Sequence, residues 1–188
     1  MQKTDKIKNF FNGSIKLITP KIHIDNRGYF TESYNLNFFK KHYQIKEKFV
    51  QDNISFSKKK STIRGMHLQI SPFEQSKLIY VIHGSILDYF IDLRKHSKTF
   101  GKYGSVRLES KKKQFLYIKK GFAHGFKTLE DCTTVVYKVS NYYSIDHELT
   151  LNYLDRTVNI NWKLNKTKPF LSKKDLNGKS LDNIKEYL

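Results

Sequence analysis

Short apolar runs separated by turn residues dominate the middle of the chain. The runs are rich in Val, Ile, Phe and Tyr, and Gly, Asn, Asp, Ser or Lys stands between them. This pattern is typical of antiparallel strands, which need only a few residues each before the chain reverses. We predict a β-sandwich or small barrel of jelly-roll type with strands at 49–55, 63–69, 77–82, 85–92, 104–108, 114–118, 125–129 and 133–139.

Helical periodicity occurs only toward the two ends of the chain. It predicts a helix over 35–43 and another over 181–188, where Leu181, Ile184 and Leu188 share a face. Between 77–82 and 85–92, Gly84 tolerates a positive φ and predicts a tight hairpin. With 188 residues and no repeat or low-complexity linker, the chain is expected to form a single domain over 1–188.

Strand alternation sorts the side chains onto faces. In 63–69, it places Ile63, Gly65, His67 and Gln69 on one face and Arg64, Met66 and Leu68 on the other. It also groups Gln51 with Asn53 and Ser55, and Tyr137 with Val135 and Val139. Polar residues in such strongly β segments either face a ligand cavity or face solvent, and alternation leaves both open.

The charge of the chain points to an anionic partner. Lys and Arg total 35 against 17 Asp and Glu, which gives a formal net charge of +18. Nucleic acid, an anionic membrane and a phosphorylated ligand are the partners to consider. Most of the cations are Lys, they are spread along the chain, and no helix-turn-helix, zinc-finger or RNP signature is present. We therefore expect no specific nucleic-acid partner. A nucleic-acid-binding protein is kept only as an alternative to a protein that binds a phosphorylated ligand.

Cysteine use and hydropathy indicate a cytoplasmic protein. The lone Cys132 cannot form an internal disulfide, and no apolar run approaches the roughly 20 residues that span a bilayer. The first residues are polar and lack the apolar region of a signal peptide. We expect no membrane partner.

Four segments in a fixed order carry a family resemblance. They read Asp-Asn-Arg-Gly-Tyr-Phe-Thr-Glu at 25–32, Phe-Val-Gln-Asp-Asn at 49–53, Ile-Arg-Gly-Met-His-Leu-Gln at 63–69 and Gly-Phe-Ala-His-Gly-Phe at 121–126. Together they resemble the nucleoside-diphosphate 4-keto-6-deoxysugar epimerases, typified by dTDP-4-dehydrorhamnose 3,5-epimerase. The resemblance covers about 14–176, with the C-terminal helix beyond it at about 180–188. It implies an all-β, cupin-type jelly roll with short peripheral helices, usually assembled as a homodimer.

The implied reaction is a cofactor-independent inversion of C3 and of C5 beside a ketone. It needs a base on one face of the sugar, a cation for the enolate and an acid on the opposite face. By resemblance, His67 is the base with Asp175 as its carboxylate partner, Tyr137 is the acid, and Lys77 lies near the ketone oxygen. The expected partner is a nucleoside-diphosphate 4-keto sugar.

Further positions are implied to bind that substrate. Arg suits a diphosphate because its planar fork bonds two oxygens at once. Alternation turns Arg64 away from His67, which a homodimer would accommodate because one strand can serve two sites. The implied substrate-binding residues are Arg27, Phe30, Glu32, Gln51, Asp52, Asn53, Arg64, His124, Tyr143, Glu148 and Lys174.

Departures from the family pattern keep other functions open. Lys119-Lys120 replaces a proline before 121–126, and no glycine turn follows Glu148. A sibling epimerase that acts at one carbon, or on a GDP- or CDP-linked 4-keto sugar or heptose, remains possible, as does a nucleotide-sugar-binding protein without turnover. Metal-dependent cupins generally use His-x-His, whereas this chain has His67-Leu68-Gln69, so no metal site is expected.

Overall fold

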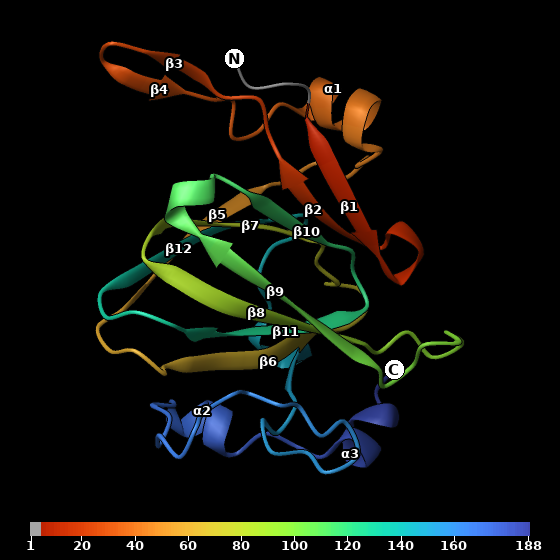
Figure 1. Cartoon of the computed structure of the whole chain (residues 1–188). Helices are drawn as coiled ribbons and strands as arrows, with labels where there is room; N and C mark the ends of the chain where they lie inside the picture. Colours follow the sequence, from red (N-terminus) through yellow and green to blue (C-terminus); the bar gives the residue numbers. More distant parts are fainter. Residues whose placement is uncertain (1–4) are drawn as a thin grey trace.

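Two antiparallel sheets face each other in the computed structural model, which describes residues 5–188 (Figure 1). The six-stranded sheet has the order β1-β2-β10-β7-β12-β5, and the five-stranded sheet has the order β13-β6-β11-β8-β9. The predicted all-β jelly roll is confirmed. The bounds are β1 Lys6–Phe10, β2 Ile15–Thr19, β5 Gln51–Ser57, β6 Ile63–Gln69, β7 Lys77–His83, β8 Ser85–Asp92, β9 Tyr103–Glu109, β10 Phe115–Ile118, β11 Phe122–Thr128, β12 Thr133–Val139 and β13 Glu148–Thr150.

A two-stranded ribbon, β3 (His23–Asp25) and β4 (Gly28–Phe30), projects beyond the six-stranded sheet near the N-terminus (Figure 1). The sequence pattern predicted neither of these strands, nor β1, β2 and β13. β1, β3 and β4 are mostly exposed and therefore lack the apolar alternation that marks a half-buried strand. We call residues 21–32, which contain the ribbon, the N-terminal arm.

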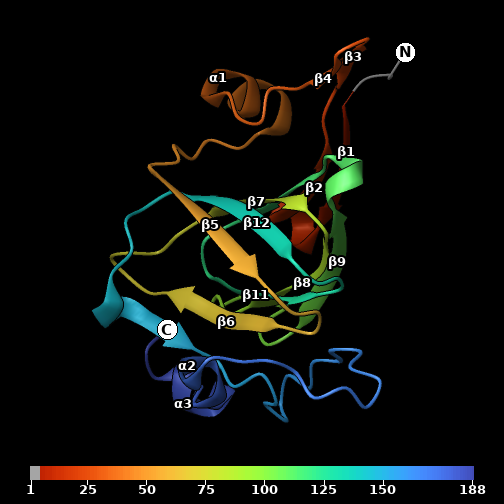
Figure 2. The same cartoon turned by 90° about the vertical axis from the view of Figure 1, so that its left-hand side faces the viewer.

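The helices are short and lie at the two ends of the sandwich. α1 and η2 share the predicted helix 35–43, and α3 occupies the first part of 181–188. Figure 2 shows α2 and α3 beneath β6. Over residues 5–188, no helix has the length and apolar character needed to cross a membrane. The bounds are η1 Phe11–Gly13, α1 Leu36–Phe38, η2 Phe39–Tyr43, η3 Ser110–Lys112, η4 Ile145–His147, α2 Lys173–Leu176 and α3 Leu181–Lys185.

The predicted hairpin at Gly84 is wrong. β7 pairs with β10 and β12, whereas β8 pairs with β11 and β9, so the chain crosses from one sheet to the other at this glycine. Gly84 has φ +78°, and a Cβ there would lie 2.5 Å from Oγ1 of Thr133. The glycine therefore makes a corner between the sheets, because both flanking strands bury apolar faces in the same interior.

Apolar side chains form three layers around the two sheets. The interior layer includes Ile79, Phe90 and Val135. A second layer lies between the six-stranded sheet and the segment that holds η2, and a third lies between the five-stranded sheet and the C-terminal segment. The outer face of the five-stranded sheet and part of the outer face of the six-stranded sheet are thus covered, whereas Ile54 and Phe56 of β5 and Ile82 of β7 remain exposed.

β6 contains one residue more than its partner between two paired positions. His67 pairs with His124 and Arg64 pairs with Phe126, so three steps on β6 match two on β11. The bulge places Arg64 and His67 on the same inward face and corrects the prediction that they face opposite ways. Gly65 makes it possible, since a Cβ there would lie 2.5 Å from Cα of Gly125.

Candidate active site

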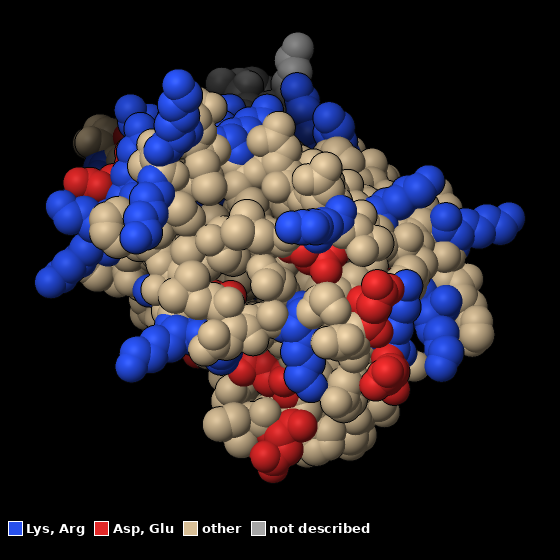
Figure 3. Space-filling view, turned by 90° about the horizontal axis from the view of Figure 1, so that it is seen from below, with Lys and Arg blue, Asp and Glu red and all other residues tan. Residues whose placement is uncertain are grey.

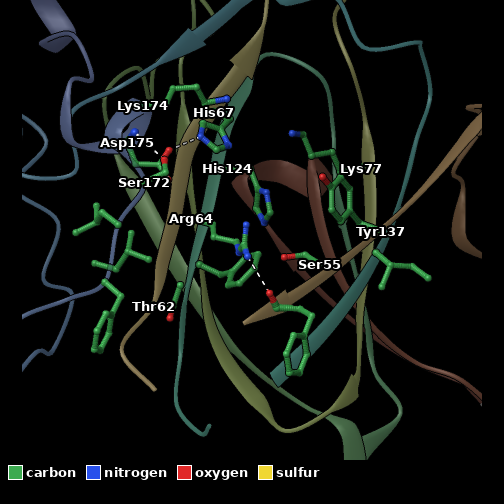
Figure 4. A pocket seen from close by; sticks show the side chains of 16 residues that line it. Ser55, Thr62, Arg64, His67, Lys77, His124, Tyr137, Ser172, Lys174 and Asp175 are labelled. Carbon is green, nitrogen blue, oxygen red and sulfur yellow. Dashed lines mark hydrogen bonds and ion pairs between the residues drawn. The ribbon is translucent and has the colours of Figure 1, made fainter. Parts of the chain in front are cut away.

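A cavity of about 590 Å³ opens between the two sheets (Figure 4). The five-stranded sheet contributes Arg64 and His67 from β6 and His124 from β11. The six-stranded sheet contributes Lys77 from β7 and Tyr137 from β12. The structure therefore brings together all four residues predicted for catalysis, with Asp175 of α2 at the rim.

His67 and Asp175 form a hydrogen-bonded pair. His67 Nε2 lies 2.6 Å from Oδ1 of Asp175, and the carboxylate side chain is 5% exposed. Burial raises the pKa of this carboxyl, but the hydrogen bonds from His67 and Ser172 and the charges of His67 and Lys174 together outweigh burial and hold the Asp175 pKa below its usual value. The ionised carboxylate fixes the orientation and tautomer of the imidazole and leaves its Nδ1 toward the cavity.

Lys77 and Tyr137 lie across the cavity from His67 (Figure 4). Burial lowers the pKa of Lys77 to about 8, against the opposing effect of the carboxylates of Glu148 and Asp88. Burial raises the pKa of the Tyr137 phenol, so the hydroxyl keeps its proton at neutral pH. A cation and a neutral proton donor therefore face a carboxylate-paired imidazole.

A second imidazole–carboxylate pair lies beside the first. His124 Nε2 lies 2.9 Å from Oδ2 of Asp88, which is fully buried. Oδ1 of Asp88 has no hydrogen-bond partner among residues 5–188, although it is buried. Burial raises the Asp88 pKa, and the charges and hydrogen bond of His124, followed by the charge of Lys77, oppose that rise. The pair fixes the ring of His124 at the wall of the cavity.

The cavity continues into a hollow of about 240 Å³ lined by Gln51, Asn53, Tyr143, Glu148 and Lys174. Glu148 accepts hydrogen bonds from Tyr143 Oη at 2.8 Å and from Lys174 Nζ at 2.7 Å. The predicted substrate-binding residues in the barrel thus lie next to the predicted catalytic ones. Gln51, Asn53 and Ser55 do share a face, and each pairs across β5 and β12 with Val139, Tyr137 or Val135.

Four predicted substrate-binding residues lie away from the cavity of this chain. Arg27 is on the N-terminal arm, where it bonds Asp25 and its side chain is 85% exposed. Phe30 and Glu32 are also exposed on the arm. Asp52 points to the outer side of β5 and bonds Lys138 there. The three residues of the arm cannot reach a ligand in the same chain's cavity without movement of the arm, and Asp52 faces away from that cavity.

Three residues near the site carried no predicted role there. The hydroxyl of Ser55 lines the cavity and, among residues 5–188, is buried without a hydrogen-bond partner. Asp88 bonds His124 at the wall of the cavity. Ser172 bonds Asp175. The available signal for Ser55 and Asp88 was strand alternation. It groups Ser55 with Gln51 and Asn53 on one face of 49–55, and it could likewise have assigned Asp88 to one face of 85–92.

The remaining charge is distributed over the surface. Figure 3 shows Lys and Arg projecting from several separate places on one face, with Asp and Glu between them. No group of three His, Cys, Asp or Glu side chains comes together to hold a metal ion within residues 5–188. The donor set that faces the cavity is suited to proton transfer and to binding an anion.

The two facing antiparallel sheets and the cavity between them place the protein in the class of cupin-type jelly rolls. Comparison with known families is more specific. The family model described as dTDP-4-dehydrorhamnose 3,5-epimerase matches residues 12–183. The chain belongs to this family, as the resemblance predicted.

Relatives support this membership over most of their length. The chain is 42% identical over 164 residues to the dTDP-4-dehydrorhamnose 3,5-epimerase of Shigella flexneri, covering 87% of this chain and 89% of that protein. It is 41% identical, with a TM-score of 0.89, to the Bacillus anthracis enzyme of that name solved with TDP and PPi bound, covering 95% and 100% of the two chains. For the Legionella pneumophila dTDP-6-deoxy-D-glucose-3,5-epimerase in complex with dTDP-4-keto-L-rhamnose, the identity is 38%, the TM-score 0.90 and the coverage 96% and 94%.

Proposed function

We propose that the protein is an epimerase that inverts C3 and C5 of dTDP-4-dehydro-6-deoxyglucose to give dTDP-4-dehydrorhamnose. The observation that carries the proposal is the placement of a carboxylate-paired imidazole on one sheet and a phenol and an ammonium group on the other. Inversion requires a base and an acid on opposite faces of the sugar, and two sheets of a sandwich supply them. The activities of the relatives named above point to the same reaction.

His67 removes the proton from the carbon next to the C4 ketone. The electron pair of the C–H bond moves to the ketone oxygen and forms an enolate, which the Lys77 ammonium stabilises. Tyr137 then donates its phenolic proton to the opposite face of the same carbon. Asp175 keeps the His67 ring in the tautomer that accepts the proton. One proton leaves the sugar and one returns, so the step needs no redox cofactor. Proton exchange with solvent returns His67 to the neutral imidazole and Tyr137 to the phenol, and C5 then reacts in the same way because it also adjoins C4.

The nucleotide and diphosphate occupy the hollow next to the reacting sugar. Tyr143 presents an aromatic ring there, and Gln51, Asn53 and Glu148 present amide and carboxylate groups. Arg64 and Lys174 supply positive charge, and His124 lines the sugar end of the cavity. A dTDP-linked substrate carries both an apolar base and a diphosphate, which matches this mixture.

A homodimer accounts for the residues that lie outside the cavity. The N-terminal arm carries Arg27, Phe30 and Glu32 away from the barrel of its own chain. In a dimer, the arm of one protomer closes the cavity of its partner and adds a cation and an aromatic ring to the nucleotide site. Asp52 remains a predicted contact, and the expected cytoplasmic location and single-domain organisation also remain predictions.

Deuterium incorporation tests the proposed reaction. The purified protein is incubated with dTDP-4-dehydro-6-deoxyglucose in D₂O, and C3 and C5 are followed by NMR. Deuterium at both carbons with formation of the rhamno sugar is the expected result. Deuterium at one carbon identifies a single-carbon epimerase instead. Absence of exchange with the dTDP-, GDP- and CDP-linked 4-keto sugars contradicts the proposal and favours a binding protein.

A further inference from the structure

Both oxygens of the Asp175 carboxylate are held by side chains. Oδ1 lies 2.6 Å from Nε2 of His67, and Oδ2 lies 2.9 Å from Oγ of Ser172. Ser172 is also the N-cap residue of α2, where its Oγ accepts the backbone N–H of Asp175 at 3.1 Å. A serine hydroxyl has one proton, and the backbone bond leaves that proton free to be donated to Oδ2.

We propose that Ser172 is a positioning residue for proton removal, which holds the Asp175 carboxylate in the orientation that supports His67. The side chains form a relay in which Ser172 donates to Asp175 and Asp175 accepts from His67. This inference rests on the proposed epimerase function, since it assigns Ser172 a part in the step that His67 performs.

The geometry explains why a carboxylate in this place needs a second partner. The terminal torsion of Asp has a broad preference, so a single hydrogen bond to His67 leaves the carboxylate plane free to turn. Asp175 is 3% exposed, so its Oδ2 depends on a donor from the protein, and Ser172 supplies that donor. The bond from Ser172 fixes the plane and adds to the effects that hold the Asp175 pKa below its usual value.

The other charged or titratable groups around the pair come from separate elements. Lys174 is on the same short helix and bonds Glu148 of β13. Lys77, His124 and Tyr137 line the cavity from β7, β11 and β12, and Arg64 lies on β6 with His67. None of these groups touches Oδ2 of Asp175 among residues 5–188. A change at Ser172 therefore reaches the pair through its own two bonds to Asp175, one to Oδ2 and one to the backbone N–H.

Substitution of Ser172 tests the relay, with Ser180 as a matched control. Ser180 begins α3 and caps it by accepting the N–H of Asn183, but it does not bond Asp175. Ser172→Ala and Ser180→Ala therefore each remove one helix cap, and only the first removes a bond to the dyad. Ser172→Thr keeps a hydroxyl in the same place and serves as the rescue variant.

Two readouts are measured on the wild type and all three variants. The first is kcat/KM against pH, and the second is the pH at which the substrate-free His67–Asp175 pair takes up a proton, followed through the Cε1–H resonance of His67. Loss of a bond to a buried carboxylate makes the pair bind its proton more readily. In Ser172→Ala we expect two pH values to rise by about one unit, the midpoint of the acid limb of kcat/KM and the midpoint of the pH titration of the resonance. We also expect kcat to fall about tenfold. Ser172→Thr is expected to restore both readouts, and Ser180→Ala to retain both.

Different results would contradict the role of Ser172 and the proposed epimerase function. A Ser172→Ala enzyme with an unchanged acid limb and resonance overturns the relay, as does an equal change in Ser180→Ala. A wild-type protein that exchanges no proton of any 4-keto sugar nucleotide overturns the proposed function instead. The resonance is read without substrate, so the two failures are distinguishable.

Discussion

The protonation states of Tyr137 and Lys77 set the pH range over which the proposed reaction can run. The Tyr137 phenol, with its raised pKa, stays protonated throughout the neutral range and is available as an acid. Lys77, with a pKa of about 8, is cationic at pH 7 and neutral well above pH 8. The enolate would therefore lose its stabilising charge on the alkaline side, whereas the acid would not lose its proton there.

The alkaline limb of the activity profile is predicted to depend on Lys77. As the pH rises through about 8, the ammonium group loses its proton and kcat falls. Lys77→Arg keeps a positive charge at these pH values, so its alkaline limb is expected to move up by more than one pH unit. Lys77→Met is expected to lower kcat about 100-fold or more at pH 7. The measurement is kcat between pH 6 and 10.

Lys127 provides the control for this prediction. Burial also lowers its pKa, but Lys127 donates to the carbonyl oxygen of Lys163 and does not line the cavity. Lys127→Arg is expected to keep the wild-type profile. If Lys77→Arg retains an alkaline limb near pH 8, another group sets that limb and the role of Lys77 is wrong.

At the residue scale, the sequence predicted the chemistry of the site better than its contacts. His67 could be singled out because it stands in one of the four motifs, and Lys77 and Tyr137 because the family resemblance implies roles for them; all three line the cavity. His67 and Asp175 are 108 positions apart, so local pattern alone could not pair them. The bond from Ser172 to Asp175 was equally out of reach, because a helix of four residues gives no periodic signal.

At the element scale, strands β5 to β12 followed from the sequence, whereas β1 to β4, β13 and the pairing of the strands did not. The apolar pattern located β6, β8 and β12 with the bounds that they have. It could not show that β7 and β8 belong to different sheets, because a glycine that permits a hairpin also permits a corner. Alternation also failed in β6, where the extra residue reverses the facing of Arg64. Bulges are set by pairing with a neighbour, which a single strand does not record.

The bulge at Gly65 predicts the effect of adding one methyl group. A Cβ at Gly65 meets the backbone of Gly125 and the carbonyl oxygen of His124, and the φ of +125° disfavours a side chain. Gly65→Ala is expected to lower the free energy of unfolding by about 3 kcal/mol and to reduce kcat, since β6 must shift with Arg64 and His67. Urea denaturation and steady-state kinetics measure the two effects.

Gly13→Ala is the control for Gly65→Ala. It measures the cost of a side chain at positive φ without the steric clash between β6 and β11. Gly13 also has a positive φ, of +80°, but a Cβ there has no neighbour within 4 Å. Its free energy of unfolding is expected to fall by only about 1 kcal/mol, with kcat unchanged. Equal losses in the two variants would show that the close approach of β6 to β11 does not matter.

At the scale of the whole molecule, the net charge of +18 and the N-terminal arm both reach beyond one cavity. A few of the cations, Arg64, Lys77 and Lys174, face the cavity, and many others lie on the surface. The surface charge raises the local concentration of an anionic sugar nucleotide without selecting it. Selection is then a task for the cavity and, in the proposed dimer, for the arm of the partner.

Mixing two inactive variants tests whether the arm acts in the partner subunit. Arg27→Ala removes a cation from the arm, and His67→Ala removes the base from the cavity. In a mixed dimer with exchanged arms, the cavity with His67 receives the intact Arg27 of its partner, so one site is complete. Denaturing and refolding the two variants together is expected to restore up to about a quarter of the wild-type activity per chain. Activity no greater than the sum of the separate variants would show that the arm serves its own chain.

His67 and Tyr137 are placed on opposite sides of the cavity, and a comparison of two variants in D₂O separates their roles. His67→Ala is compared with Tyr137→Phe on dTDP-4-dehydro-6-deoxyglucose, and NMR records both deuterium content and configuration at C3 and C5. We predict that His67→Ala incorporates no deuterium at either carbon. Tyr137→Phe is predicted to exchange the proton with retention of configuration, because the base remains and the acid on the opposite face is gone. Full inversion by Tyr137→Phe, or exchange by His67→Ala at the wild-type rate, would contradict the account.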